Sequence, residues 1–361
     1  MVERMQAVVV SGIRMMELRE FDKPTLGPKD LLMKIKYCGI CASDIHTWEG
    51  AWQPRYPYIP GHEFIGEVAE AGEEALEWRG LNTGDQVAVE MIIPCYRCKW
   101  CMQGLYNLCI YDREYGYNIP TSTPQTPSWG GYSQYLYVPE NAIVHKFHKG
   151  VDWKEGAVTE PLAVSCRAVN LAQISSGNSA AVVGPGMIGL TAVVAAKAAG
   201  ANPVILLGTR DYRLRVGEAL GADYTINVSE GGFFQRVMEL TDGIGSDVVL
   251  ETAGAESAQA LSFKLARKGG KVVLVGLSGE KKLTITPDSD IVTKELTVKG
   301  SMLSAHAYQQ SMRIIESGTF PLKRLITHVF PLKDVDRAYE LILKREDNVL
   351  KVLLDPWLQT E

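Results

Sequence analysis

The stretch Ser179-Ala-Ala-Val-Val-Gly-Pro-Gly-Met-Ile-Gly189 joins a continuous apolar run to three glycines with the spacing G-x-G-x-x-G. The Ala-rich segment Met187–Ala199, which has a strong helix propensity, follows directly. A strand, a glycine turn and a helix in this order are typical of a dinucleotide-binding βαβ unit, in which the helix N-terminus faces the pyrophosphate. A glycine-rich turn without a ligand is the alternative. The expected cofactor contacts here are Gly184, Gly186, Met187 and Gly189.

The pattern of strand followed by helix continues on the C-terminal side of this turn. Further short apolar runs predict strands, and helical segments separate most of them. The expected strands are Pro203–Leu207, Asp247–Leu250, Lys271–Val275 and Leu296–Lys299, and the expected helices include Tyr212–Leu220 and Ala255–Ala266. This alternation predicts an α/β domain with a doubly wound parallel sheet over residues 156–300.

The end of the second expected strand indicates which nicotinamide dinucleotide binds. A carboxylate about twenty residues after the glycine turn would bond the ribose 2′-hydroxyl of NAD, but this chain has Gly208-Thr209-Arg210 there. A hydroxyl and a guanidinium suit the 2′-phosphate of NADP, and Gly208 would leave space for it. NADP is therefore favoured over NAD, although Asp211 could instead hold the ribose hydroxyls. Arg213 and Gly276 complete the expected cofactor site.

The residues before about position 155 are organised differently. Short alternating or β-branched runs, separated by glycine and proline, predict a compact, barrel-like antiparallel β domain over residues 1–155. The last part of the chain, 301–361, contains the amphipathic segment Leu332–Lys344 and the strand-like segment Val349–Leu354. We expect it to return and complete the first domain.

Four cysteines lie close together in the first domain with the spacing C-x2-C-x2-C-x7-C. Thiolates at this spacing can hold a tetrahedral Zn²⁺ with every position filled by protein, which makes the site structural. A zinc ribbon that binds nucleic acid is the rival interpretation, but this chain lacks the basic surface that such a module needs. The expected ligands of this lobe, residues 95–109, are Cys95, Cys98, Cys101 and Cys109.

Three other segments carry potential ligands for a second, catalytic zinc. Cys41 and His62 would supply a thiolate and an imidazole, which leaves a position open for water or substrate once a carboxylate is added. That carboxylate is either Glu63 or Glu160. Each residue alone is more often an ordinary buried side chain, but their conjunction favours a metal. One glutamate is expected inside the shell at a time, because a second would oppose the negative charge of an ionised alcohol.

Length and charge exclude several other classes of protein. A chain of 361 residues is longer than one hydrophobic core usually supports, so two domains are expected. A net charge of −5 argues against nucleic-acid binding, and no stretch approaches the ~18 apolar residues of a membrane span. The odd number of cysteines, four of them at metal-ligand spacing, indicates reduced thiols rather than disulfides. We therefore expect a soluble, cytoplasmic protein.

Together these motifs resemble those of the zinc-dependent medium-chain dehydrogenases and reductases, the alcohol dehydrogenase superfamily, and especially its sorbitol, threonine and polyol branch. The resemblance covers nearly the whole chain in the same order and rests on Gly39–His46, Gly61–Glu63, the four-cysteine lobe, Glu160–Leu162, Gly184–Gly189 and Asp247–Gly254. It implies a GroES-like catalytic domain, a Rossmann domain, an active site between them, two zinc ions per chain, and a homotetramer or homodimer.

The resemblance also implies hydride transfer between a secondary alcohol or polyol and NAD(P), with zinc lowering the pKa of the alcohol. Ser43 and His46 match the family's proton relay, although His46 could instead be an ordinary surface histidine. The interval from Cys41 to His62 is shorter than is usual in the polyol branch, and the segment Tyr115–Trp129 is longer. Substrate preference therefore does not transfer from the family.

Two other functions compete with this one. A zinc-free quinone or enone reductase would leave Cys41, His62 and the cysteine lobe without a purpose. A non-catalytic zinc- and nucleotide-binding protein would need a damaged catalytic set, and the sequence shows no damage. A small-molecule alcohol or ketone is the expected partner, with neither nucleic acid nor membrane involved.

Overall fold

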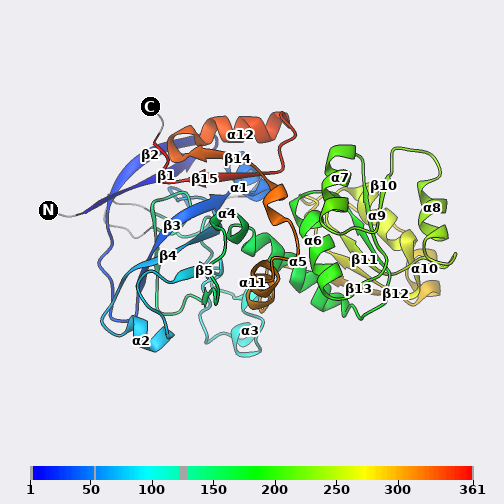
Figure 1. Cartoon of the computed structure of the whole chain (residues 1–361), viewed down its shortest axis with the longest axis horizontal. Helices are drawn as coiled ribbons and strands as arrows, with labels where there is room; N and C mark the ends of the chain where they lie inside the picture. The colour runs from blue at the N-terminus through cyan, green and yellow to red at the C-terminus, as the bar shows by residue number, and fades with distance from the viewer. Residues whose placement is uncertain (1–2, 53, 122–127, 360–361) are drawn as a thin grey trace. The chain divides into compact units, whose positions relative to one another are not determined.

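The structure, a computed structural model, describes residues 3–52, 54–121 and 128–359. The chain forms two compact units: unit 1 extends to Glu160 and resumes at Ile326, and unit 2 is Pro161–Leu325. The boundary expected after residue 300 lies 25 residues later, after Leu325. The reason is that helix α11 (Tyr308–Glu316) packs on helix α6 (Met187–Ala198) within unit 2. Figure 1 shows the chain coloured along its sequence.

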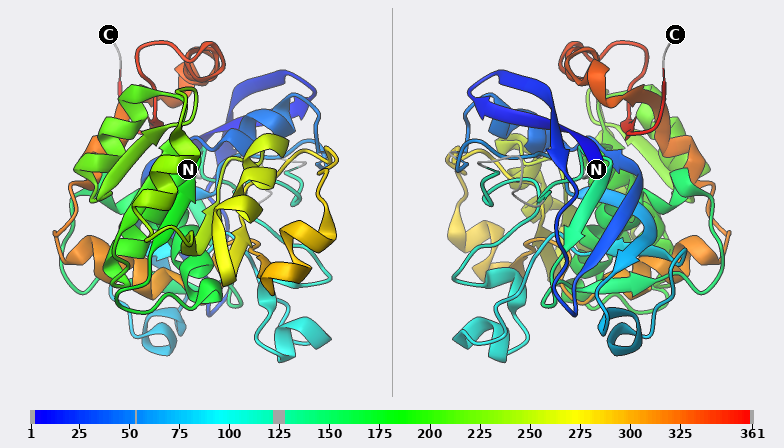
Figure 2. Two further views of the ribbon diagram at one scale, coloured as in Figure 1. Left: turned by 90° about the vertical axis from the view of Figure 1, so that its right-hand side faces the viewer. Right: turned by 90° about the vertical axis from the view of Figure 1, so that its left-hand side faces the viewer.

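Unit 1 is built on a mainly antiparallel β-sheet, as predicted. Its strands are β3 (Leu31–Gly39), β4 (Glu63–Ala71), β5 (Gln86–Val89), β6 (Tyr135–Val138), β7 (Val144–Lys146), β14 (Ile326–Pro331) and β15 (Lys351–Asp355). They follow the order β14-β15-β3-β4-β5-β7, and β6 also pairs with β3. The strands β1 (Arg4–Gly12) and β2 (Met15–Asp22) form a separate antiparallel ribbon, the dark-blue pair in Figure 2.

The C-terminal strand β15 belongs to the core of unit 1. It pairs in parallel with β14 and antiparallel with β3, between which it lies in Figure 1. Its first four residues, Lys351 to Leu354, are all buried. A continuous buried run is what a strand covered on both faces requires. The amphipathic helix α12 (Val335–Lys344) buries Val335, Ala338 and Tyr339 in the same core.

Short helices complete unit 1 and carry several of the site residues. They are α1 (Ala42–Trp48), α2 (Ala75–Arg79), α3 (Lys99–Met102) and α4 (Trp153–Gly156). Helix α5 (Thr159–Ala172) begins at the end of unit 1 and continues into unit 2. In the described part of the chain, no helix combines the length and the apolar content needed to cross a bilayer.

Unit 2 is a parallel sheet of six strands with helices between most of them. The strands are β8 (Ala180–Val183), β9 (Val204–Gly208), β10 (Tyr224–Asn227), β11 (Ser246–Glu251), β12 (Ala266–Leu274) and β13 (Thr297–Gly300). The helices, besides α6 and α11, are α7 (Asp211–Ala219), α8 (Phe233–Glu239), α9 (Glu256–Leu265) and α10 (Pro287–Asp290). The strand order β10-β9-β8-β11-β12-β13 is that of the Rossmann fold and confirms the predicted doubly wound sheet.

Candidate active site and metal centres

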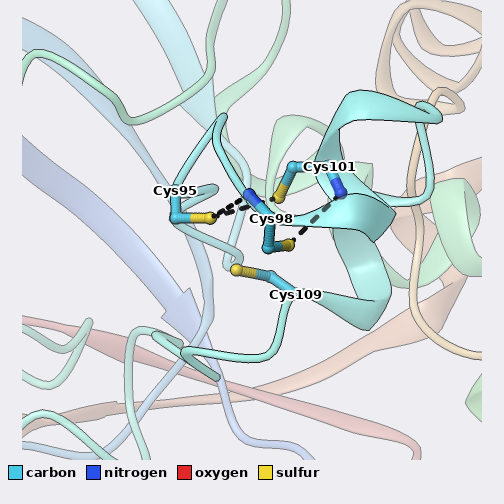
Figure 3. A group of neighbouring side chains, drawn as sticks. All are labelled: Cys95, Cys98, Cys101 and Cys109. Atoms are coloured by element: carbon cyan, nitrogen blue, oxygen red, sulfur yellow. Dashed lines mark hydrogen bonds between the residues drawn. The ribbon is translucent and has the colours of Figure 1, made fainter.

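The four cysteines of the lobe converge on one point. Their sulfur atoms, from Cys95, Cys98, Cys101 and Cys109, all lie within 4.8 Å of one another. Figure 3 shows the sulfur atoms turned toward one another, and all four thiols are free. Free thiols at this separation, drawn from one short segment, fit a tetrahedral zinc ion with no position left for substrate.

Backbone N–H groups of the lobe prepare these thiols for a metal. The N–H of Cys98 donates to Cys95 Sγ at 3.3 Å, and the N–H of Cys101 donates to Cys98 Sγ at 3.4 Å. The N–H groups of Cys101 and Ile110 lower the pKa of the Cys98 thiol to about 6. Donors that favour the thiolate help to offset the charge that four sulfurs place on one ion.

A second group of potential ligands lies where the sequence predicted a catalytic zinc. Cys41, His62 and Glu63 each offer one ligand atom, and these three atoms lie within 4.8 Å of one another. His62 and Glu63 are buried, while Cys41 is half-buried. The buried His62 Nδ1 makes no well-aligned hydrogen bond with any described residue, although Asp44 Oδ1 lies 3.3 Å away. A thiolate, an imidazole and a carboxylate fit a zinc site that keeps an open position.

Asp44 supports His62 from the first turn of α1. Its Oδ1 lies 3.3 Å from His62 Nδ1, and its Oδ2 accepts hydrogen bonds from the N–H of Cys41 at 2.9 Å and from Tyr132 Oη at 3.0 Å. Burial alone would lower the pKa of His62, but Asp44 and Cys41 raise it well above its ordinary value. With Nδ1 turned toward this carboxylate, Nε2 is the nitrogen available to a metal.

Lys351 supports Glu63 from the other end of the chain. Its Nζ lies 2.8 Å and 2.6 Å from the two carboxylate oxygens of Glu63, and it donates to the carbonyl of Ile40 at 2.9 Å. Both side chains are buried, and removing one partner of such a pair costs about 3–5 kcal/mol. Burial would lower the pKa of Lys351, but Glu63 and Cys41 raise it. The ammonium therefore stays charged and holds Glu63 in place beside His62.

Glu160 lies near this group but is not among the three residues that meet within 4.8 Å. It is buried at the start of α5 and belongs to unit 1. Burial raises its pKa to about 7, with His62 lowering it and Glu63 raising it. Glu160 therefore interacts electrostatically with both His62 and Glu63, and it remains a candidate to replace Glu63 as a metal ligand.

The two relay candidates lie on α1, three residues apart. Ser43 is half-buried and accepts a hydrogen bond from Tyr117 Oη at 2.5 Å. His46 is exposed, and its ring meets Trp52 edge-on with 6.2 Å between centroids. One helical turn therefore connects a hydroxyl beside the metal ligands to an imidazole in contact with solvent.

In unit 2 the glycine turn connects β8 to α6, as predicted. Gly184 has φ of +108°, and a Cβ on Gly189 would lie 1.7 Å from the Gly184 carbonyl oxygen, so neither position tolerates a side chain. Gly186 caps α6 and has open space where a Cβ would be, and Met187 is the first residue of the helix. An open glycine at a helix N-terminus is what a pyrophosphate needs.

The end of β9 and the start of α7 carry the residues expected to bind the adenosine ribose. A Cβ on Gly208 would lie 2.3 Å from Pro185 Cγ, so this position does not tolerate a side chain. Thr209 is exposed, and Arg210 and Arg213 are half-buried at the start of α7. Asp211 Oδ1 accepts a hydrogen bond from Asn227 Nδ2 at 2.8 Å. Gly276 follows β12, and a Cβ there would meet the Gly254 nitrogen.

Three residues of the catalytic group were missed in the sequence. Asp44 had a signal, because it is an acidic residue in the N3 position of a helix capped by Cys41. Lys351 had one too, as the only charged residue within the apolar run Val349–Leu354. Tyr117 had none. Burial raises the pKa of the Tyr117 phenol well above its ordinary value, with Asp44 and Cys41 adding to the rise, so it stays neutral.

We expect the purified chain to carry two zinc ions of different lability. The cysteine lobe is closed, whereas the group of Cys41, His62 and Glu63 keeps an open position that a chelator can enter. Mild chelation should remove one equivalent of zinc, as measured by elemental analysis, while circular dichroism and the Tm change little. Loss of both ions together, or a chain that never holds more than one, would contradict this expectation.

Comparison with known proteins covers both units. Residues 27–151 match the family model for the alcohol dehydrogenase GroES-like domain, and residues 188–317 match that for zinc-binding dehydrogenases. The chain is 36% identical to an erythritol/L-threitol dehydrogenase of Mycolicibacterium smegmatis over 98% of both chains. It is 35% identical to a sorbitol dehydrogenase of Halalkalibacterium halodurans, over 94% of this chain and 95% of the relative.

A solved structure of similar length shares the whole fold. The crystal structure of a zinc-binding dehydrogenase from Sinorhizobium meliloti, bound to NADP, matches with a TM-score of 0.88 and 32% identity, covering 98% of this chain and 100% of that one. The family models and these relatives together cover both units of the chain. The chain therefore belongs to the zinc-binding alcohol dehydrogenase family of the medium-chain dehydrogenases and reductases.

Proposed function

We propose that the chain is a zinc-dependent dehydrogenase that transfers hydride between a secondary alcohol or polyol and NAD(P). The observation that carries this proposal is the meeting of Cys41, His62 and Glu63 within 4.8 Å, in a chain whose relatives include erythritol, threitol and sorbitol dehydrogenases. Zinc bound there would supply Lewis-acid chemistry, lowering the pKa of an alcohol and polarising a carbonyl.

The surrounding residues prepare this centre for catalysis. Asp44 orients the His62 ring and favours the Nδ1–H tautomer, so that Nε2 can bind metal. Lys351 compensates the charge of Glu63 and fixes its carboxylate. Cys41, His62 and one glutamate give a set of ligands with two negative charges. Glu63 is the favoured carboxylate, and Glu160 is the alternative that would exchange with it as substrate enters.

The proton of the alcohol leaves through α1. Ser43 receives it beside the ligand group, and His46, one turn along the helix and exposed, passes it to water. An imidazole suits the last step because its ordinary pKa lies near neutral pH. The remaining link between Ser43 and His46 would be the ribose of the cofactor, as in the family that the chain resembles.

The cofactor binds in unit 2, and NADP is favoured over NAD. The glycine turn Gly184–Gly189 would hold the pyrophosphate at the N-terminus of α6. Thr209 and Arg210 offer a hydroxyl and a guanidinium to the 2′-phosphate, while the carboxylate of Asp211 already accepts a hydrogen bond from Asn227. Arg213 adds a second positive charge to the same end of α7.

We also expect the chain to assemble as a tetramer, with a dimer as the alternative. Strand β13 lies at one edge of the parallel sheet, and Val298 and Met302 nearby are 37% and 43% exposed. Pairing of β13 across a two-fold axis would cover backbone groups that otherwise invite aggregation. Light scattering should give four times the mass of the chain. The mass of a single chain would refute the assignment.

A panel of alcohols tests the proposed activity. Polyols, cyclic alcohols and sugar acids are offered to the zinc-loaded protein with NAD and NADP, and formation of reduced cofactor is followed. We expect polyols to be oxidised. A zinc-free quinone or enone reductase would instead reduce enones without metal, and a non-catalytic binding protein would turn over nothing. A cytoplasmic location is supported by the free state of all seven cysteines.

A further inference from the structure

We propose that Tyr117 selects substrates that carry a second hydroxyl group on the carbon next to the one that is oxidised. The inference rests on the proposed function, since it assigns a specificity role at the same site. Tyr117 touches both functional parts of that site. Its Oη donates a hydrogen bond to Ser43 Oγ at 2.5 Å, and its ring lies against the His62 ring, with 5.1 Å between centroids and 33° between planes.

The backbone around Tyr117 fixes it in this position. Gly116 has φ of +85°, and a Cβ there would lie 2.7 Å from the carbonyl oxygen of Gly61, the residue before His62. Only glycine allows so close an approach. The N–H of Gly116 donates to the carbonyl of Trp129 at 2.8 Å, and the N–H of Tyr115 donates to the carbonyl of Met91 at 2.9 Å. These backbone contacts hold Tyr117 beside the metal ligands, so its position does not depend on its side-chain conformation alone.

The chain on the C-terminal side of Tyr117 is also held by a backbone hydrogen bond. Thr121 is buried, and its N–H donates to the carbonyl of Pro57 at 2.7 Å. Within the segment, the N–H of Glu114 donates to Asn118 Oδ1 at 2.9 Å. Tyr117 lies between these anchors, and its phenol is held as a preorganised group, which lowers the entropy cost of binding a ligand.

The phenol can still accept a hydrogen bond. A tyrosine hydroxyl has one proton to donate, and here it goes to Ser43, but its oxygen also has lone pairs. Ser43 in turn is the residue that receives the proton of the reacting hydroxyl in the proposed function. Tyr117 Oη, which keeps a lone pair for a further hydrogen bond, therefore lies 2.5 Å from Ser43 Oγ, which bonds the reacting hydroxyl.

This spacing matches a vicinal diol. Oxygens on adjacent carbons in a bent conformation lie about as far apart as two hydrogen-bonded oxygens, roughly 3 Å. When the first hydroxyl bonds Ser43, the second can donate to Tyr117 Oη. A monoalcohol cannot, and it leaves this lone pair of the half-buried Tyr117 without a partner. Sites built to bond a hydroxyl discriminate strongly against analogues that lack it.

Two alcohols that differ in one hydroxyl group test the proposal. The zinc-loaded enzyme is assayed with 2,3-butanediol and with 2-butanol, and kcat/KM is compared. Wild type should prefer the diol. Tyr117→Phe keeps the ring on His62 but removes the hydroxyl. Loss of the hydrogen bond to Ser43 affects both alcohols, whereas loss of the contact to the second hydroxyl affects only the diol, so the ratio of kcat/KM for the diol to that for the monoalcohol should fall about tenfold.

Tyr115→Phe is the matched control. Tyr115 belongs to the same segment and donates its hydroxyl to the carbonyl of Tyr137 at 2.9 Å. This variant also loses one partly buried hydrogen bond, so its Tm should fall, but its preference for the diol should equal that of wild type. A merely structural role of Tyr117 would make both variants behave alike.

A binding measurement adds a readout that does not depend on turnover. In the presence of the reduced cofactor the diol cannot react, and calorimetry gives its Kd. Wild type should bind the diol more tightly than the monoalcohol, and Tyr117→Phe should lose that difference. Equal affinities in wild type, or an unchanged diol preference in Tyr117→Phe, would overturn the role of Tyr117 and leave the proposed function standing. Failure of wild type to oxidise either alcohol or any polyol would overturn the proposed function and this inference with it.

Discussion

Replacing Cys41 by serine or His62 by alanine is expected to abolish turnover without unfolding the chain. Both side chains belong to the group that fits the open zinc site, and each supplies one of its few ligands. Loss of a partner outside the ligand shell costs about ten- to a hundredfold in metal affinity or activity. Loss of a ligand should therefore cost more, with one equivalent of zinc missing in elemental analysis.

Cys166→Ser is the matched control for Cys41→Ser. Cys166 is a buried free thiol on α5 in unit 2, outside both ligand groups. The same chemical change there should leave the zinc content and kcat near those of wild type. If Cys41→Ser retained both equivalents of zinc and full activity, the assignment of the catalytic centre would be wrong.

The relay residues should show smaller and graded effects. His46→Ala should slow turnover and shift its pH profile, because water can partly replace an exposed imidazole. Ser43→Ala should fall between His46→Ala and the ligand variants, since Ser43 lies beside the ligands and water reaches it less easily. If His46→Ala matched wild type between roughly pH 6 and 10, the relay would not include this residue.

Arg210→Ala is expected to remove most of the preference for NADP. A charge-assisted contact between a guanidinium and a phosphate contributes about 1.5–3 kcal/mol, which corresponds to a preference of roughly ten- to a hundredfold. Arg210 begins the turn into α7, next to the exposed Thr209. The variant should weaken NADP and leave NAD almost unchanged, both in kcat/KM and in the Kd of the reduced cofactors.

The complementary variant is Thr209→Asp, which should reverse the preference. A carboxylate at this exposed position would repel the 2′-phosphate and accept hydrogen bonds from the ribose hydroxyls. Gly208 is unsuitable for this purpose, because any Cβ there would collide with the ring of Pro185. A higher kcat/KM with NAD in wild type, or an unchanged ratio in Arg210→Ala, would show that Asp211 binds the ribose instead.

Features that depend on local spacing could be predicted from the sequence. The four cysteines of the lobe lie within one short segment, so their separation along the chain determines whether their sulfurs can meet. The same holds for the turn Gly184–Gly189, which needs only a strand before it and a helix after it. Cys41 and His62 are farther apart in the sequence. They could be assigned to one metal site only because the order of the motifs along the chain resembles that of a known family.

Features that depend on distant contacts could not be predicted in this way. Lys351 reaches Glu63 across 288 positions of the sequence, and only the pairing of β15 with β3 shows that the two meet. The short strand β10 was missed because only Ile226 among its four residues is buried. The collision that a side chain at position 208 would make with Pro185 could not be predicted either, because a sequence does not show where the proline ring lies.

The central claim is that the group around Cys41 and His62 holds a zinc ion on which the oxidation of a polyol depends. The most direct test follows reduction of NADP and NAD by erythritol and sorbitol before chelation, after removal of the labile zinc, and after zinc is returned. The account predicts that the enzyme is active before chelation. It predicts that activity is lost when the labile zinc is removed, although the fold and one zinc ion remain, and that activity returns when zinc is added back. Turnover that persists without the labile zinc, or no turnover of any polyol by a chain holding both ions, would contradict it.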